Sequence, residues 1–226
     1  MYKMIRILRK ILLWFFILSI GSVILYAFIP VPVSPLMLIR LKEQWSADKG
    51  FRMQRDWVSL SEVNPAVVQA VICAEDANFL RHHGFDLKAI NAAYKANKQG
   101  KKIKGASTIS QQTAKNVFLW PSRTYLRKGL EAYFTVLIEL FWSKKRIMEV
   151  YLNVIETGDG IYGIEAASQE YYKKKASALN RGEAAMIASI LPNPRIFSPL
   201  KPSSKIYRKQ KNVLRRMRST PPPDWK

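Results

Sequence analysis

Cysteine and histidine are scarce in this sequence, with one cysteine and two histidines among 226 residues. A single thiol cannot form an intramolecular disulfide or a cysteine-based zinc site. Cys73 stands in the apolar run Val71–Ala74, so we expect a small buried hydrophobic residue. His82 and His83 are adjacent and point in different directions on any regular element, which argues against a histidine metal site. The sequence therefore predicts neither a cysteine-based nor a histidine-based metal site.

Acidic residues are also few, since 16 Asp and Glu stand against 37 Lys and Arg and give a formal net charge of +21. Such an excess indicates an anionic partner, which is a nucleic acid, a lipid head-group surface or a phosphorylated substrate. Apolar residues make up 48% of the chain, enough for a folded core, so extensive disorder is excluded. The length allows one ordinary domain and an appendage.

Charge is absent from residues 11–29, a 19-residue apolar stretch within the roughly 17–25 residues that span a bilayer. Residues 1–10 carry four basic side chains and no acid. By the positive-inside rule we expect a cytoplasmic basic tail at 1–10, a single-pass transmembrane anchor at 11–29 and export of everything that follows. The alternative is a cleaved signal peptide, whose apolar region would be about 7–15 residues and would end in a small-x-small site. This stretch is longer, and only Ala27 is small near its end.

After the anchor the periodicity is helical, and alternating apolar and polar runs are nearly absent, which predicts a mostly α domain. We expect a juxtamembrane connector at 30–60, with apolar Leu36–Ile39 on the membrane, then a catalytic domain at 61–200 and a basic helix and tail at 201–226. Three predicted helices begin at the caps Asn64, Asp86 and Asn180. A longer helical stretch is predicted from Tyr125 to about Asn153, with a break near Ser143, and the last predicted helix spans about 203–218.

Four polar clusters contain residue types that carry chemistry: Glu75–Gly84, Gly105–Asn116, Arg123–Glu131 and Lys144–Ala166. Each has a plain structural explanation, namely a polar helix end, a polar surface helix, a surface ion pair between helix neighbours and a tight glycine turn. The first two also indicate function. A carboxylate pair that ends an apolar helix is costly to bury, and a row of hydroxyls, amides and lysine suits phosphate or sugar oxygens.

The clusters fit four patterns in order: E-D-x-x-F-x-x-H-x-G, G-x-S-T-I-x-Q-Q, R-K-x-x-E and K-x-x-I-x-E-x-Y-L-N. They stand at Glu75–Gly84, Gly105–Gln112, Arg127–Glu131 and Lys144–Asn153. On these motifs the sequence resembles, over about residues 60–200, the peptidoglycan glycosyltransferase family, which is found alone and as the N-terminal module of bifunctional penicillin-binding proteins. A chance match to the first pattern alone is roughly one in 10⁴, and several motifs in order are far more specific.

The resemblance implies a mainly α fold, with a lysozyme-like glycosyltransferase head and a small membrane-associated lobe, preceded by one transmembrane helix. It implies that the sugar hydroxyl of lipid II attacks the anomeric carbon of a glycan on undecaprenyl diphosphate, and that the lipid diphosphate leaves. It places the protein in the bacterial cytoplasmic (inner) membrane, with the domain on the periplasmic or outer face.

By the same resemblance Glu75 is the general base for the acceptor hydroxyl. Glu131 is the second essential carboxylate, which we assign to holding cations or a divalent metal. Lys115 and Arg123 match positions that neutralise the diphosphate. The other expected substrate-binding residues are Asp76, Phe79, Ser107, Thr108, Gln111, Gln112, Asn116, Arg127 and Lys128.

The expected partners are lipid II, undecaprenyl-diphosphate-linked glycan, the membrane and other wall-synthesis proteins, and no nucleic acid. Some family members use Mg²⁺ or Mn²⁺ with the diphosphate, whereas no motif here serves a metal alone. A lysozyme-like hydrolase would share the fold and a catalytic glutamate, but it needs no cation cluster beside the cleft. A nucleic-acid-binding protein that uses the basic helix is disfavoured by export, and anionic lipids explain the same charges.

Overall fold

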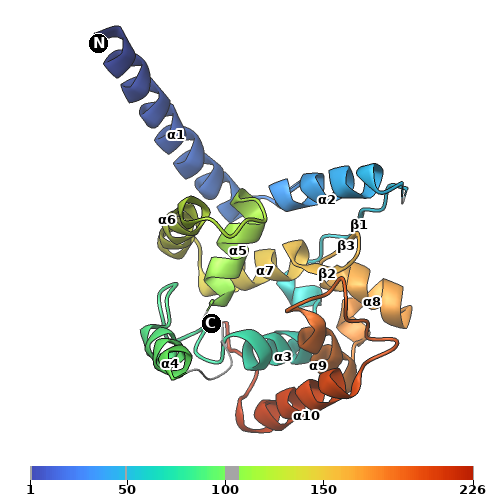
Figure 1. Ribbon diagram of the computed structural model, residues 1–226. Coiled ribbons are helices and arrows are strands. Elements are labelled where there is room, and N and C mark those ends of the chain that lie inside the picture. The colour runs from blue at the N-terminus through green and yellow to red at the C-terminus, as the bar shows by residue number, and fades with distance from the viewer. Residues whose placement is uncertain (1, 49, 100–106, 226) are drawn as a thin grey trace.

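The computed structural model describes residues 2–48, 50–99 and 107–225, and the fold is mainly α, as the sequence predicts (Figure 1). The helices are α1 (Tyr2–Phe28), α2 (Pro35–Ser46), α3 (Pro65–Glu75), α4 (Leu87–Lys98), α5 (Ile109–Phe118), α6 (Tyr125–Phe141), α7 (Lys144–Val154), α8 (Ile164–Tyr172), α9 (Arg181–Ile190) and α10 (Ser204–Ser219). Short 3-10 helices span Leu60–Glu62 and Ala176–Ala178. The strands are β1 (Gln54–Arg55), β2 (Glu156–Gly158) and β3 (Ile161–Tyr162). The lysozyme-like character of the head stays a prediction.

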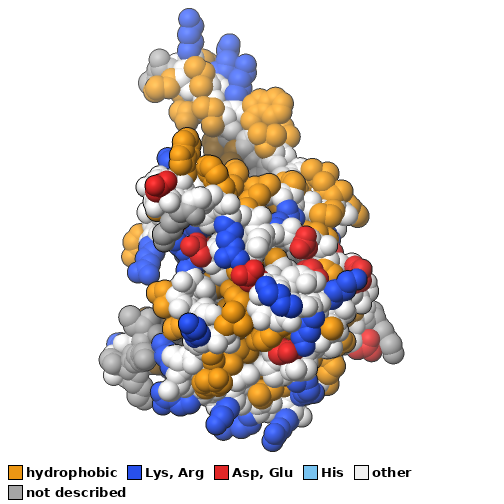
Figure 2. Space-filling view, turned by 90° about the vertical axis from the view of Figure 1, so that its right-hand side faces the viewer, with side chains coloured by type: hydrophobic (Ala, Val, Ile, Leu, Met, Phe, Trp, Pro, Cys, Tyr) orange, Lys and Arg blue, Asp and Glu red, His pale blue; other side chains and the backbone are white. Residues whose placement is uncertain are grey.

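Helix α1 projects away from the rest of the molecule (Figure 1). Its 27 residues are long and apolar enough to cross a membrane, and they include the basic stretch as well as most of the expected anchor. Basic side chains gather at its tip, and hydrophobic side chains cover the part below them (Figure 2). So large an exposed apolar surface is typical of a segment that lies in lipid. The helix therefore fits a single-pass membrane anchor.

The C-terminal part of α1 packs against α6 and α7 through a contact that we call the anchor joint. Ser19 and Tyr133 share a hydrogen bond between their hydroxyls at 2.8 Å. The indole N–H of Trp142 donates to the carbonyl oxygen of Val23 at 2.7 Å. The guanidinium of Arg146 donates through two nitrogens to the carbonyl oxygen of Tyr26 at 3.0–3.1 Å, in the last turn of α1, where helical carbonyls have no partner within the helix. Ser19 and Val23 are buried, so the joint is a packed contact as well as a set of polar ones.

Residues 30–60, expected as a connector, contain helix α2 and strand β1. A serine cap and a proline at the first helical position start α2. Leu36 and Met37 are buried in the domain, whereas Leu38 is exposed. The expectation that all of Leu36–Ile39 lies on the membrane is therefore wrong for its first two residues, because they face the core.

A small sheet in the order β1-β3-β2 joins this segment to the chain after α7. β1 runs parallel to β3, and β2 runs antiparallel to it. Gly160, between β2 and β3, has a φ of +70°, and a Cβ there would lie 2.4 Å from the carbonyl oxygen of Arg52. Glycine is thus required both by the turn and by the close approach of the two chains. The sheet places Glu156, the first residue of β2, beside α2.

The predicted helix starts are confirmed by side-chain caps. Asn64, Asp86 and Asn180 each accept a backbone N–H two or three residues further on, at 2.8–3.0 Å. Asn180 also forms the predicted capping box with Glu183. The expected break near Ser143 is real, since α6 ends one residue before Trp142 and Ser143 caps α7. These caps satisfy N–H groups that a helix start leaves without partners.

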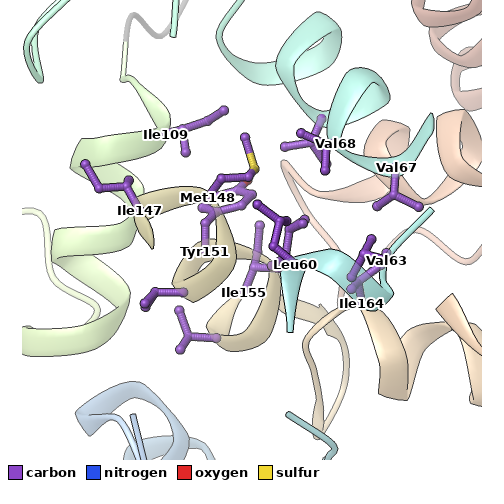
Figure 3. Close-up of a cluster of buried hydrophobic side chains, with 14 of the residues drawn as sticks. Leu60, Val63, Val67, Val68, Ile109, Ile147, Met148, Tyr151, Ile155 and Ile164 are labelled. Atoms are coloured by element: carbon purple, nitrogen blue, oxygen red, sulfur yellow. The ribbon is translucent and has the colours of Figure 1, made fainter. Parts of the chain in front are cut away.

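The main core lies between α3, α5 and α7 (Figure 3). Val67 and Val68 from α3, Ile109 from α5, and Met148 and Tyr151 from α7 are at most 2% exposed. Full burial of one such side chain stabilises the fold by about 1.5–3 kcal/mol. The end of α3 and the start of α5 therefore have a firm base, and both carry expected site residues.

Cys73 is buried on α3, as the sequence predicts. Burial raises the pKa of its thiol, because the thiolate would lose its hydration. A neutral, buried thiol is unreactive. Cys73 thus fills the core, and the chemistry falls to other side chains.

Candidate active site

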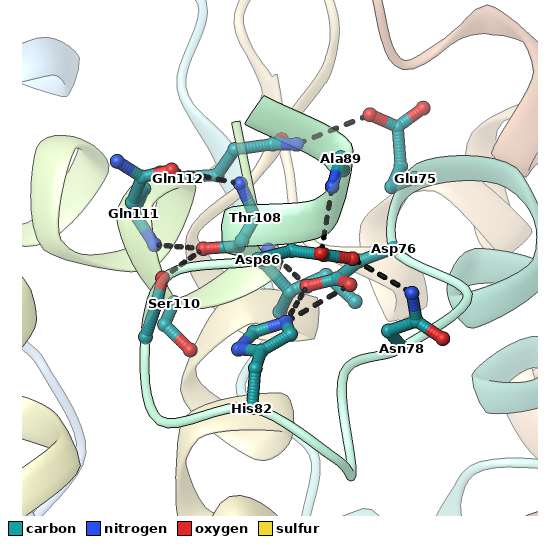
Figure 4. Close-up of polar contacts among 12 residues, drawn as sticks. Glu75, Asp76, Asn78, His82, Asp86, Ala89, Thr108, Ser110, Gln111 and Gln112 are labelled. Atoms are coloured by element: carbon teal, nitrogen blue, oxygen red, sulfur yellow. Dashed lines mark hydrogen bonds and ion pairs between the residues drawn. The ribbon is translucent and has the colours of Figure 1, made fainter. Parts of the chain in front are cut away.

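Glu75 is the last residue of α3, and its two carboxylate oxygens face different elements (Figure 4). The side-chain amide of Gln112, on α5, donates to Oε2 of Glu75 at 3.1 Å. The ammonium of Lys209, on α10, lies 3.4 Å from Oε1. The hydroxyl of Tyr151 donates to the amide oxygen of Gln112 at 3.2 Å, which fixes the amide with its NH₂ toward Glu75. Burial raises the pKa of Tyr151 well above its usual value, so this hydroxyl keeps its proton.

Asp76, the next residue, is buried and has its oxygens engaged (Figure 4). The ring Nε2 of His82 lies 3.0–3.1 Å from both oxygens, and the N–H of Ile109 donates to Oδ2 at 3.0 Å. The carboxylate thus ties the end of α3 to the start of α5. A negative charge at a helix N-terminus is also favoured by the helix dipole. Asp76 thus links the loop that contains His82 to the start of α5. Its expected contact with substrate stays a prediction.

Thr108 and Gln111 form a capping box at the start of α5 (Figure 4). The Gln111 amide oxygen accepts the N–H of Thr108 at 3.0 Å, and the Thr108 hydroxyl donates to the carbonyl of Gly84 at 2.6 Å. Gly84 has a φ of +87°, and a Cβ there would lie 2.8 Å from the side chain of Thr135. Both capping residues are buried, so the structure gives them a supporting position rather than an open one.

Glu131 on α6 stands in a different environment. Its Oε2 accepts from Arg127, and its Oε1 pairs with the ammonium of Lys128. Glu131 is 3% exposed and Arg127 is 9% exposed. The plain interpretation of this cluster as a surface ion pair is therefore wrong, because burial removes both groups from water. Loss of one partner from such a buried pair strongly destabilises the fold, because the other charge is left buried without a counter-charge.

A cavity of about 490 Å³ lies next to both glutamates, since its lining includes Gln112, the partner of Glu75, and Arg127, the partner of Glu131. Its basic lining residues are Arg40, Lys115, Arg123, Arg127 and Arg195. Burial lowers the pKa of Lys115, and the charge of Glu131 opposes that shift. Glu156, Glu131 and Glu43 pair with Arg40, Arg127 and Arg195 respectively, and the five cations still give the lining an excess of positive charge. The cavity is therefore suited to a doubly charged anion such as a diphosphate.

The structure gathers five of the expected substrate-binding residues around this cavity. They are Gln112, Lys115, Asn116, Arg123 and Arg127. Glu75 does not line it, but Gln112 touches both the cavity and Glu75. The other expected residues lie elsewhere.

Phe79 is fully buried, so an expected substrate contact at this residue is not supported, because no part of its ring reaches the surface. Instead the ammonium of Lys144 lies 4.6 Å from the centre of its ring, and the ring serves the packing. Ser107 is exposed and is not part of the lining, and Lys128 touches the site only through Glu131. Gly105, the first residue of the second pattern, lies outside the described residues.

Three charged residues of the cavity lining were missed by the sequence analysis: Arg40, Glu156 and Arg195. Nε of Arg40 lies 3.2 Å from Oε1 of Glu156, and Nη2 donates to Oε2 at 3.3 Å. Burial raises the pKa of Glu156, and the nearby charge of Arg40 opposes this. Arg195 pairs with Glu43 of α2 at 3.1 Å. The available signal was a single charge within an apolar run, as at Arg40 between Ile39 and Leu41.

Within the described ranges no three His, Cys, Asp or Glu side chains are grouped so that they could hold a metal ion. Both oxygens of Glu131 are already engaged by cations. Hard divalent ions such as Mg²⁺ are bound in many enzymes through substrate phosphates with one or two carboxylates. The residues described here fit that mode better than a metal cage of the protein's own.

Comparison with known proteins identifies the family of the chain. The sequence model of the transglycosylase family matches residues 43–218. The chain is 54% identical over 208 residues to the biosynthetic peptidoglycan transglycosylase of Bdellovibrio bacteriovorus, which covers 92% of this chain and 83% of that protein. The proteins of the same name are 50% identical in Caulobacter vibrioides, over 92% of this chain and 90% of that one, and 49% identical in Bacteroides thetaiotaomicron, over 97% and 88%.

These matches define an enzyme of the glycosyltransferase class. The chain belongs to the transglycosylase family, as its motifs predict.

Proposed function

We propose that the protein polymerises the glycan strands of peptidoglycan. It transfers the growing glycan from undecaprenyl diphosphate to the sugar hydroxyl of lipid II and releases undecaprenyl diphosphate. The observation that carries the proposal is the cation-lined cavity, which is linked through Gln112 to the carboxylate of Glu75. A base next to a diphosphate-sized basic cavity fits a transfer in which a diphosphate is the leaving group.

In the proposed step Glu75 accepts the proton of the attacking hydroxyl. The oxygen forms a bond to the anomeric carbon of the donor, and the bond from that carbon to the phosphate oxygen breaks. The electron pair leaves with the diphosphate. A diphosphate departs without a proton, so no second carboxylic acid is needed, in contrast to a glycosidase that expels an alcohol.

The cations stabilise the charge that develops on the leaving group. We assign this role first to Lys115 and Arg123, with Arg127 and Lys128 assisting. Glu131 then keeps Arg127 and Lys128 in place, because it engages both. Arg40 and Arg195 add positive charge at the cavity wall. Any Mg²⁺ or Mn²⁺ that takes part is held mainly by the diphosphate oxygens.

The membrane anchor supports a substrate that is itself lipid-linked. We propose that the basic end of α1 lies in the cytoplasm and that the domain faces the outer side of the bacterial inner membrane, where other wall-synthesis proteins work. The basic residues of the N-terminal stretch support this orientation. A test is to place a cysteine at exposed Trp45 and label it in intact cells with a membrane-impermeant reagent.

The function is tested by incubating the purified protein in detergent with labelled lipid II and separating the products by size. We expect glycan polymer from the wild type and a rate about 10²–10⁴-fold lower for Glu75→Gln, because the amide cannot accept the proton. Glu170→Gln is the matched control, since it makes the same chemical change on α8, where Glu170 pairs with Arg52. Folded wild-type protein that binds lipid II and forms no polymer would contradict the proposal.

A further inference from the structure

Helix α10 carries most of the positive charge near the C-terminus, and one of its cations, Lys209, reaches the general base of the proposed reaction. Ile206, Val213 and Met217 form its buried face. Lys209 lies three residues after Ile206 and four before Val213, which places it beside that face. Its ammonium reaches the edge of the active site and lies 3.4 Å from Oε1 of Glu75. Lys211, on the same helix, is exposed.

The position of α10 against α3 is fixed by contacts that do not involve Lys209. The guanidinium of Arg216 donates to the carbonyl oxygen of Cys73, two residues before Glu75, at 2.9 Å. The amide of Gln69 on α3 donates to the carbonyl of Met217 at 2.8 Å. Two points of attachment to α3, together with the apolar face, determine where Lys209 stands. Its approach to Glu75 therefore follows from the packing of the helices and not from the reach of a loose side chain.

We propose that Lys209 is a positioning residue for the general base, and this inference rests on the proposed function of Glu75. Lys209 and Gln112 approach different oxygens of the carboxylate, so together they restrain its plane and leave lone pairs of Oε1 available for the hydroxyl proton. An ionised donor makes the stronger type of hydrogen bond to a carboxylate. The role of the basic C-terminal helix is then partly catalytic support, in addition to any attraction for anionic lipid.

The first experiment compares Lys209→Met, Lys209→Arg and Lys211→Met in lipid II polymerisation. We expect Lys209→Met to lower kcat about tenfold with KM unchanged, because a base out of position affects the transition state more than substrate binding. Lys209→Arg restores most of kcat, since it keeps the charge and the donors. Lys211→Met behaves as wild type. An unchanged kcat in Lys209→Met, an equal loss in Lys211→Met, or a change in KM alone would overturn the inference.

A chemical rescue separates the ammonium from the rest of the side chain. Cys73 is the only native cysteine and is buried, so a Lys209→Cys variant has one accessible thiol. Alkylation of this thiol with 2-bromoethylamine creates a lysine analogue and is expected to restore kcat. A neutral methylthio group attached to the same thiol is not expected to restore it. Equal activity after both treatments would show that bulk, and not the charged donor, is what matters.

A double-mutant cycle tests the contact without substrate and is independent of the reaction. The melting temperatures of Lys209→Met, Glu75→Gln and the double variant are expected to be non-additive, while the cycle of Lys211→Met with Glu75→Gln is additive. Absence of polymer from wild type together with a coupled cycle would refute the proposed function and keep the contact. Polymer from wild type together with an additive cycle would refute the role of Lys209.

Discussion

The molecule holds two glutamates near the same cavity in opposite ways. Glu75 ends α3 with a neutral amide on one oxygen and a cation 3.4 Å from the other. Glu131 lies in the middle of α6, almost fully buried, and is bonded by Arg127 and Lys128. Both stand in motifs by which the sequence resembles the family, and the residue type alone does not separate them. Their surroundings do.

The difference indicates which glutamate can do chemistry and which can organise charge. Both oxygens of Glu131 are engaged by cations, so neither is open to a substrate hydroxyl. A carboxylate with looser partners can accept a proton and still be held in place. We therefore expect Glu75 to act on the substrate and Glu131 to act on the cations.

The largest expected effect is in Glu131→Gln. This variant leaves the buried guanidinium of Arg127 without a counter-charge, which lowers the free energy of unfolding by about 3 kcal/mol and abolishes most activity. Glu75→Gln is the matched control, with activity lost and stability within about 1 kcal/mol of wild type. Denaturant unfolding in detergent measures the first quantity, and lipid II polymerisation the second. Equal stability of the two variants would show that the comparison is mistaken.

The next effect concerns the pH dependence of Lys115. Since burial lowers its pKa, Lys115 loses its charge at a lower pH than an ordinary lysine, and kcat/KM falls on the alkaline side as pH rises through that pKa. Lys115→Arg keeps its charge throughout, so its alkaline fall moves to higher pH. The measurement is kcat/KM between pH 7 and pH 10.5, and the fall is expected at a lower pH for wild type than for Lys115→Arg. An alkaline limb that does not move in Lys115→Arg would assign it to another group.

A smaller effect is expected at Arg123, which lines the cavity but is exposed. Arg123→Ala raises KM for lipid II about fivefold and leaves the melting temperature unchanged, because an exposed cation contributes attraction and little stability. The defect shrinks at high salt, where the wild-type attraction is screened. Arg81→Ala serves as the control, since Arg81 is exposed on the loop after α3 and does not line the cavity. The same KM change in both variants would mean a general effect of net charge.

The smallest effect is expected at Thr108, where two variants distinguish a helix-capping role from a contact with the substrate. Thr108→Ala removes the N-cap of α5 and the bond to Gly84, which costs about 1 kcal/mol of stability. Thr108→Ser keeps both bonds and is expected to match wild type in melting temperature and in kcat/KM. A Thr108→Ser variant that is stable but has a raised KM would instead indicate contact between the methyl group and the substrate.

Local features of the fold were predictable, because a cap and its helix are neighbours in sequence. Asn64, Asp86 and Asn180 signalled their helices correctly for this reason. Helix α2 was missed, since its apolar residues directly follow the anchor and look like part of a membrane-lying connector. The family motifs indicated where the site lies, but they did not show the structural role of each residue. Phe79 and Gln112 stand in such motifs alike, and only packing shows that one is core and the other faces the cavity.

The parts of the site that escaped prediction are formed by residues far apart in sequence. Arg40 meets Glu156 across 116 positions, and Lys209 meets Glu75 across 134. No spacing rule links such residues, because tertiary packing alone brings them together. A charge inside an apolar run raises suspicion, but it does not name the partner.

The anchor joint has a consequence for how the enzyme meets its substrate. A domain on a slack tether would sample many tilts and heights over the bilayer, and each encounter with a lipid-linked sugar would have to find the right one. Because Tyr133, Trp142 and Arg146 hold the C-terminal part of α1, the cavity keeps a fixed height and orientation relative to that helix. Under the proposed function, a lipid-linked substrate that diffuses in the bilayer would meet the cavity at one height and in one orientation.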